Sequence, residues 1–196
     1  YSCVNEDFLI YGDKSRKSKL NLSIRPGLSL NTIEFGSGNP NYAQGDFSFR
    51  PGIRMGFEAE FVVPWWTKKL MVVVEPAFRY HNTNNLSING KKGYDFMSIA
   101  ASTGLRYNIF LNRSRIFINL NLIIDFPLNE SVFFENGLGY FTRTGLSLTP
   151  SIGFKLASKI SIEARYSRFL QVLENFSEPP IRTYNTIEFI LGYQIY

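Results

Sequence analysis

The residue in this chain best suited to acid–base chemistry is its single histidine, His81. His81 ends an apolar segment, and Asp95 and Ser98 follow a polar stretch that would return the chain beside it. A base, a hydroxyl and a carboxylate within hydrogen-bond distance are what nucleophilic catalysis requires. The alternative is a histidine at the edge of a loop without a catalytic role, and it is the simpler interpretation.

Metal and disulfide chemistry are not expected. The chain has one cysteine, Cys3, which is far in sequence from His81. One thiol and one imidazole so far apart cannot close a zinc site, and a single cysteine cannot form a disulfide within the chain. The sequence therefore predicts no metal and no cofactor.

A larger group of candidate residues consists of charged side chains that recur at alternate positions. This group comprises Arg25, Arg50, Arg54, Glu58, Glu60, Glu75, Arg79, Arg106, Asp125, Glu163, Arg165 and Glu188. One interpretation is the lining of a selective pore, and the other is a set of buried ion pairs. Ion pairs are favoured because buried charge requires partners and the two signs nearly balance.

The elements that must position these charges are β-strands. Between Ser48 and Val63, apolar side chains occupy the odd positions, while Arg54, Glu58 and Glu60 occupy even ones. A period of two indicates a strand with one face in each of two environments. Hydrocarbon on one face and charge on the other, over about ten residues, is typical of a membrane-spanning barrel.

Eight such segments follow one another, and the connections between them alternate in length. Short turns are expected at 64–69, 112–114 and 157–159, and longer polar connections lie between them, including 82–93 and 127–139. Outer-membrane barrels have short periplasmic turns and longer extracellular loops. An even number of strands then places both ends of the barrel on the periplasmic side.

The predicted fold is therefore all-β: an eight-stranded antiparallel up-and-down transmembrane β-barrel. The barrel domain is expected to span 18–196 and to follow a linker or periplasmic tail at 1–17. The expected location is a bacterial outer membrane, in contact with its lipid. Trp65 and Trp66 lie beside two lysines in one short turn and are expected to anchor the barrel at the membrane interface.

Composition agrees with a barrel and excludes other classes. Hydrophobic residues make up 44% of the 196 residues, and no apolar run is long enough for a membrane-spanning helix. The aromatic content of 16% is natural for interfacial girdles. The net charge of +5 comes from dispersed bases, so nucleic-acid binding is not expected. We expect an export signal to precede the given sequence.

Two local features depart from the regular pattern. Pro26, Pro51, Pro76 and Pro150 fall within strands, where each removes a backbone donor, so local bulges are expected there. Tyr196 has inward parity, although the terminal aromatic residue of an outer-membrane barrel usually faces outward. Either the last strand ends before Tyr196 or its register shifts near Gly192.

Four stretches of the sequence are distinctive, namely residues 22–28 (LSIRPGL), 52–61 (GIRMGFEAEF), 74–78 (VEPAF) and the ending ILGYQIY. Together they resemble the PorT-like outer-membrane β-barrel family of Bacteroidetes. The resemblance covers roughly residues 18–196 and implies an eight-stranded barrel. Some relatives are labelled as GTPases of tRNA modification, but this chain has no phosphate-binding G-x-x-x-x-G-K-[ST] motif.

The expected function is non-enzymatic. The chain would be an accessory or structural subunit of a larger outer-membrane assembly for protein secretion, barrel assembly or nutrient uptake. One alternative is a stand-alone surface-binding, adhesin-like barrel. The other is a lipid-modifying or proteolytic enzyme that uses His81.

Overall fold

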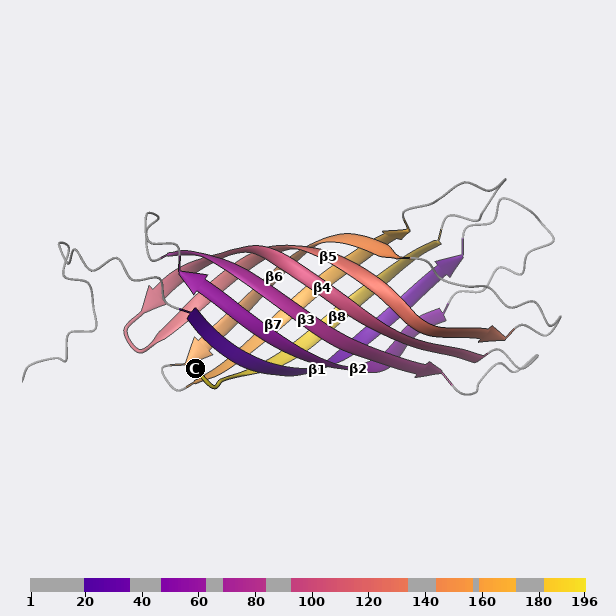
Figure 1. Ribbon diagram of the computed structural model, residues 1–196, viewed down its shortest axis with the longest axis horizontal. Helices are drawn as coiled ribbons and strands as arrows, with labels where there is room; N and C mark the ends of the chain where they lie inside the picture. Colours follow the sequence, from indigo (N-terminus) through magenta and orange to yellow (C-terminus); the bar gives the residue numbers. More distant parts are fainter. Residues whose placement is uncertain are drawn as a thin grey trace, which may run out of the picture.

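A closed β-barrel is the architecture of the computed structural model, which describes residues 20–35, 47–62, 69–83, 93–133, 144–156, 159–171 and 182–196. The strands are β1 Leu20–Phe35, β2 Phe47–Val62, β3 Leu70–Thr83, β4 Gly93–Leu111, β5 Ser114–Phe133, β6 Gly145–Leu156, β7 Ile160–Gln171 and β8 Arg182–Gln194. Each strand pairs antiparallel with the next, and β8 pairs with β1 (Figure 1). The predicted eight-stranded antiparallel barrel is confirmed. The described residues include no helix long and apolar enough to cross a membrane.

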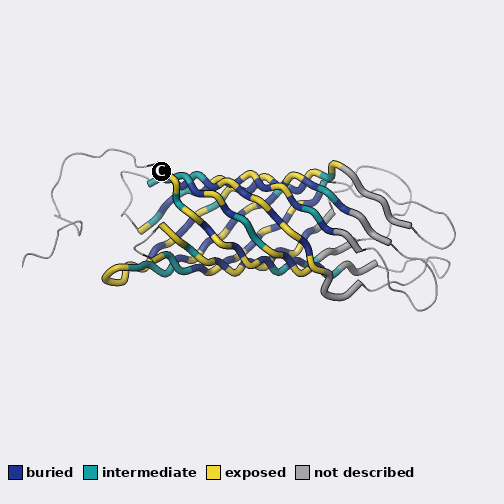
Figure 2. The backbone as a smooth tube through the Cα atoms, turned by 90° about the horizontal axis from the view of Figure 1, so that it is seen from below, coloured by how far each residue is buried: buried dark blue, intermediate teal, exposed yellow. Residues whose placement is uncertain are grey.

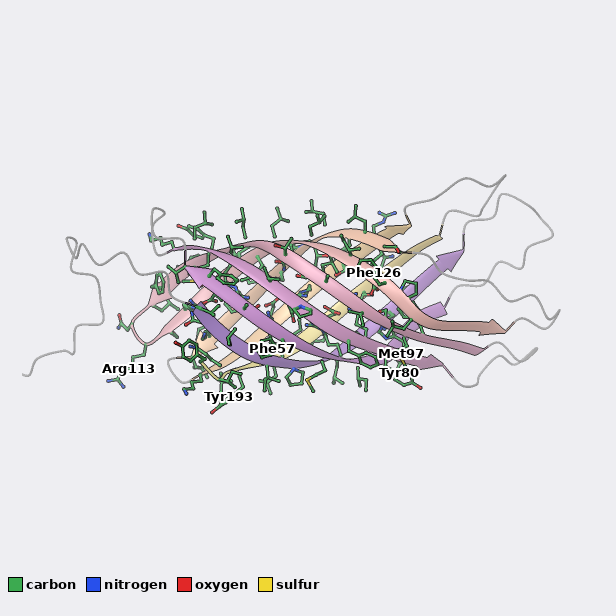
Figure 3. All side chains as sticks on the ribbon, in the orientation of Figure 1. Phe57, Tyr80, Met97, Arg113, Phe126 and Tyr193 are labelled. Carbon is green, nitrogen blue, oxygen red and sulfur yellow. The ribbon has the colours of Figure 1, made fainter. Side chains whose placement is uncertain are left out.

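Exposure alternates along the strands, as the period of two predicts (Figure 2). Every strand has large apolar side chains on its outer face, and Leu28, Leu148 and Ile162 are each more than half exposed. Figure 3 shows Phe57 and Tyr193 pointing away from the barrel. An apolar surface over a whole closed wall is the surface that a hydrocarbon environment requires.

The barrel wall is higher on one side than on the other. Strands β4 and β5 have 19 and 20 residues, whereas β6, β7 and β8 have 12 to 13. A membrane-spanning strand needs only about 9–11 residues. The β4–β5 hairpin therefore continues beyond the span at the end with the long connections.

This extension corrects the predicted loop at 127–139. Strand β5 continues to Phe133, which pairs with Gly93 of β4. The ladder passes Pro127 through a register shift, because Ser98 pairs with Pro127 while Met97 pairs with Asn129. A β-bulge of this kind accommodates a residue that cannot donate, so the proline does not end the strand.

The bulges expected at Pro26, Pro51, Pro76 and Pro150 are not found. Pro26, Pro76 and Pro150 pair with Met55, Ala101 and Leu120 without a register shift. On their other side the described pairing is interrupted and then resumes in the same register. A proline lacks a donor toward one neighbour only, so the second ladder holds the strand in place.

The β1–β2 ladder has a register shift of its own, between Asn31 and Ile33. This shift lies beyond the pair that Pro51 forms with Leu30, so no bulge is centred on Pro51 either.

The last strand ends before Tyr196, which was the first of the two alternatives. Strand β8 ends at Gln194, and the carbonyl oxygen of Leu22 accepts hydrogen bonds from the backbone N–H groups of both Ile195 (2.8 Å) and Tyr196 (3.3 Å). Because the pairing is irregular here, Tyr196 does not face the interior as its parity predicts. Tyr196 is 74% exposed.

Candidate functional site

The interior of the barrel is lined with charge from all eight strands, with β6 contributing only Lys155 at the short-turn mouth. The alternation turns these residues inward, where the side chains of Arg25, Glu75 and Glu188 are each no more than 2% exposed. An eight-stranded barrel has an interior just wide enough for side chains to fill. Charged groups in such a space must therefore satisfy one another.

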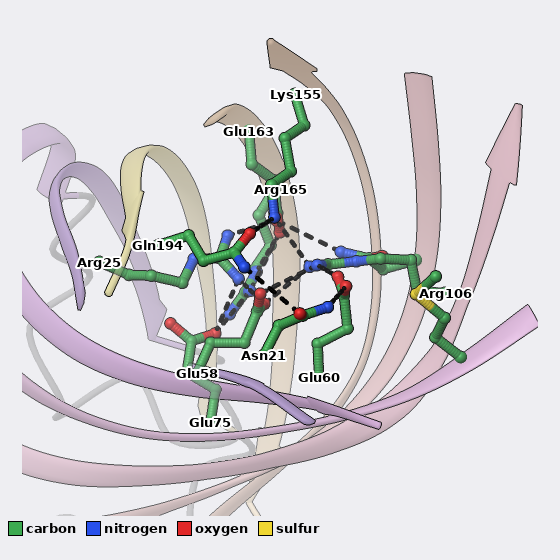
Figure 4. Close-up of polar contacts among 12 residues, drawn as sticks. Asn21, Arg25, Glu58, Glu60, Glu75, Arg106, Lys155, Glu163, Arg165 and Gln194 are labelled. Carbon is green, nitrogen blue, oxygen red and sulfur yellow. Dashed lines mark hydrogen bonds and ion pairs between the residues drawn. The ribbon is translucent and has the colours of Figure 1, made fainter. Parts of the chain in front are cut away.

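Toward the end with the short turns, the charges form a continuous chain of contacts (Figure 4). Arg115 pairs with Glu60 (2.7 Å between nitrogen and oxygen), and Arg106 pairs with Glu60 (2.6 Å) and Glu58 (2.7 Å). Arg25 then joins Glu58 to Glu163 of β7. This group connects β1, β2, β4, β5 and β7 across the interior.

Toward the other end the network continues through Glu75. Its carboxylate accepts from Arg54 (2.5 Å) and Arg165 (2.8 Å). Arg165 also pairs with Glu163 (3.0 Å), which links this group to the first.

The last branch of the network runs through Glu188. Arg79 pairs with Glu188 (3.0 Å) and with Asp125 (3.4 Å), and Arg165 lies within 3.8 Å of Glu188. Among the described residues, six arginines and six carboxylates thus form one connected set, and six positive charges minus six negative charges leave a formal charge of zero. Every charged side chain of this set therefore has a partner of opposite sign within the set.

The structure brings eleven of the twelve predicted interior charges into this network. The exception is Arg50, whose side chain lies outside the described residues, as do Trp65 and Trp66. Arg115 is an additional member that the predicted set lacked. It has the same inward parity as the others, so the alternation could have identified it.

Sequence analysis also missed the apolar side chains inside the barrel. Phe117 is 1% exposed, and the Arg106 guanidinium carbon lies 4.3 Å from the centre of its ring. The space for this ring comes from Gly153 on β6, where an added Cβ would lie 2.1 Å from a ring carbon of Phe117. A neighbouring glycine opposite an inward aromatic residue is the signal that could have indicated this packing.

His81 lies inside the barrel and is not a loop-edge residue. It is 5% exposed and stacks on Phe96 with 5.8 Å between ring centroids. Gly52 provides its space, since an added Cβ there would lie 1.8 Å from Nδ1 of His81. The Asn31 amide donates to Nδ1 (2.7 Å), and the Ser29 hydroxyl lies 3.4 Å from the same nitrogen.

The predicted catalytic partners of His81 are not assembled in the described residues. The hydroxyl of Ser98 has no hydrogen-bond partner there, and the side chain of Asp95 lies outside them. A catalytic histidine contacts its nucleophile through one ring nitrogen and its orienting group through the other. In this barrel Ser29 and Asn31 both face Nδ1, so the geometry fits a packed polar cluster.

The short-turn mouth of the interior carries one more cation. Lys155 donates to the side-chain oxygen of Gln194 (2.5 Å), and Gln194 donates to Asn21 (3.3 Å). Asn21 in turn donates to Glu60 (2.8 Å), which connects this mouth to the charge network. No group of three or more His, Cys, Asp or Glu residues in the described part is placed to hold a metal ion.

A closed eight-stranded wall with an apolar outer face and a charge-paired interior defines the class of this protein. It is an integral membrane β-barrel of the outer-membrane type, with an interior occupied by side chains.

Comparison with known proteins supports this class at the level of the fold. No protein-family model matches the chain, and no curated protein matches it. Among solved structures, the outer-membrane enzyme PagL is similar with a TM-score of 0.55 and 12% identity, over 84% of this chain and 98% of that one.

Two other solved structures are similar with slightly lower TM-scores. Ail, the attachment invasion locus protein of Yersinia pestis, was solved in complex with the heparin analogue sucrose octasulfate. It has a TM-score of 0.50 and 14% identity, over 90% of this chain and 99% of that one. Neisserial surface protein A has a TM-score of 0.50 and 12% identity, over 88% and 96%. At these identities the likeness concerns the eight-stranded barrel alone.

Proposed function

We propose that this protein is a non-enzymatic outer-membrane barrel that serves as an accessory or structural subunit of a larger outer-membrane assembly. The observation that carries the proposal is the closed charge network, which joins Arg25, Glu75, Arg106 and Glu188 through ion pairs across the interior. An interior filled in this way offers no path for a solute, and its histidine is engaged by neutral polar groups. What remains available to a partner is the outer wall and the two rims.

In this proposal the short turns face the periplasm and the long connections face the outside, as in other barrels of this size. The PorT-like resemblance supports the same placement. The assembly would be one for protein secretion, barrel assembly or nutrient uptake.

The outer wall has a suitable place for a protein neighbour on β2–β4. Ala59 on β2 pairs with Val74 on β3, and two residues further along β3 Pro76 pairs with Ala101 on β4, so Ala59, Pro76 and Ala101 lie on a diagonal across three strands. Within lipid there is no net hydrophobic drive between proteins, so association depends on close packing at small residues. This face would let a neighbouring wall approach closely.

The test is extraction of native membranes with a mild detergent, followed by size-exclusion chromatography and mass spectrometry. We expect a stoichiometric larger partner that is lost in the variant Ala101→Trp. The matched control is Ile162→Trp on β7, which is also exposed and lies on the opposite side of the barrel. A species of barrel and micelle alone, at several detergent strengths, would refute the subunit proposal.

A second candidate is a surface-binding barrel, and the raised β4–β5 hairpin is the observation that favours it. The hairpin carries pairing as far as Gly93 and Phe133, beyond the length that the membrane requires. Ail, with the same fold, was solved with a heparin analogue. Saturable binding of purified barrel to immobilised heparin, lost when residues 93–95 and 130–133 are deleted so that both strands are shortened at this end, would favour this candidate.

A further inference from the structure

The outer wall has an apolar groove over the strands opposite the small-residue face. The groove has a volume of about 640 Å³ and is lined by residues of β5, β6, β7 and β8. Its middle is Ala164, which pairs with Ile152 on β6 and with Phe189 on β8. The groove forms because the short side chain of Ala164 lies between the larger side chains of Ile152 and Phe189. All three side chains are exposed.

Charge on the outer surface has a single sign. Wherever side chains are described, every exposed charged residue is basic, namely Lys69, Arg113, Lys159 and Arg168. The described carboxylates are all buried in the interior. Three of these four bases lie in the short turns, so among the described side chains this rim presents positive charge and no exposed carboxylate to an anion.

Two of these bases, Lys159 and Arg113, lie at the short-turn end of the strands that form the groove. Lys159 immediately precedes β7, and its carbonyl oxygen accepts from the backbone N–H of Gln194 (2.7 Å), which holds the turn against β8. Arg113 lies in the tight turn before β5, and the next residue, Ser114, pairs with Leu156 at the end of β6. Figure 3 shows Arg113 at the tip of this turn, directed away from the wall.

The distance from the bases to the groove matches one lipid molecule. Five residues separate Lys159 from Ala164 along β7, about 17 Å of strand at roughly 3.3 Å per residue. A strand tilt of about 40° reduces this to a depth of about 13 Å. Half of a hydrocarbon core is about 15 Å, so the groove lies at acyl-chain depth while the bases lie at headgroup level.

We propose that this face binds an anionic glycerophospholipid, with its phosphate between Arg113 and Lys159 and one acyl chain in the groove over Ala164. A ligand with a long apolar part and one anionic end satisfies both features, whereas a soluble anion would use only the bases. The choice of a glycerophospholipid over lipid A rests on the proposed periplasmic orientation of the short turns. The binding itself does not rest on the subunit proposal.

The test uses the purified barrel in maltoside micelles, titrated with phosphatidylglycerol or with phosphatidylcholine of identical chains and followed by native mass spectrometry. We expect one phosphatidylglycerol per barrel, bound at least tenfold more tightly than phosphatidylcholine. The double variant Arg113→Gln/Lys159→Gln should remove this preference, and Ala164→Phe should weaken both lipids. The matched controls are Arg168→Gln, a base at the opposite end, and Thr103→Phe, an exposed residue on β4 outside the groove; both should bind as the unmodified barrel does.

Folding of each variant is verified by the mobility difference between heated and unheated samples, and Ala164→Leu replaces Ala164→Phe if the latter does not fold. Equal affinity for the two lipids, or an unchanged preference in the double variant, would overturn the proposal. Displacement of the lipid by inorganic phosphate alone, or preferential binding of lipid A at this face, would also overturn it. Because the test uses the isolated barrel, its failure is distinct from the absence of a protein partner in native extracts.

Discussion

Neutralising one carboxylate in the interior provides the sharpest test of the charge network. Glu58 is 5% exposed and pairs with both Arg25 and Arg106. The substitution Glu58→Gln keeps the shape of the side chain and removes its charge. It leaves six arginines against five carboxylates in the described network.

The size of the effect follows from the remaining partners. Removing one partner of a buried pair costs about 3–5 kcal/mol of unfolding free energy. Arg25 retains Glu163, and Arg106 retains Glu60, so the lower end, about 3 kcal/mol, is expected.

The compensating change is Arg106→Met. The methionine can pack on Phe117, which now lies under the guanidinium, and Glu60 retains Arg115. The single variant Arg106→Met should lose about 3 kcal/mol, because it leaves five arginines against six carboxylates. The double variant Glu58→Gln/Arg106→Met restores neutrality and should lose only about 1–2 kcal/mol, since a buried pair can be replaced by uncharged groups at little cost.

The assay is reversible urea unfolding in phospholipid vesicles, followed by tryptophan fluorescence and by gel mobility of unheated samples. The control Arg168→Gln removes an exposed charge and should change the unfolding free energy by no more than about 0.5 kcal/mol. The reasoning would be refuted if the double variant lost as much as the two single variants together. It would also be refuted if Glu58→Gln alone unfolded like the unmodified protein.

Three further predictions concern the barrel as a whole. Unheated protein should run faster than heated protein on a denaturing gel, since the closed sheet persists in detergent; identical mobility together with a helical circular dichroism spectrum would contradict the fold. Purified protein in planar bilayers should show no stable open channel, because the interior is filled and charge-paired; reproducible unitary steps of porin size would contradict this. Gly52→Ala should destabilise the barrel by about 1–3 kcal/mol because the added Cβ would overlap His81, and His81→Ala in the same chain should restore most of the loss; equal urea midpoints for Gly52→Ala and the unmodified protein would count against the packing.

The sequence by itself determined which side chains face inward and which face outward. This is a local property, because successive side chains of a strand point to opposite faces and an apolar–polar alternation has only one favourable placement. Arg54, Glu58 and Glu60 on β2 could therefore be assigned to the interior from their spacing alone. The number of strands followed from counting such segments.

Only the tertiary structure decided which charges meet. Arg25 and Glu163 are 138 residues apart and come together because β8 pairs with β1 and closes the barrel. Their contact depends on the stagger accumulated around eight strands, which no local pattern encodes. The same holds for His81, whose neighbours Ser29 and Asn31 lie two strands away across a glycine. Parity along a strand assigns a face, but the partners on that face are set by closure of the whole sheet.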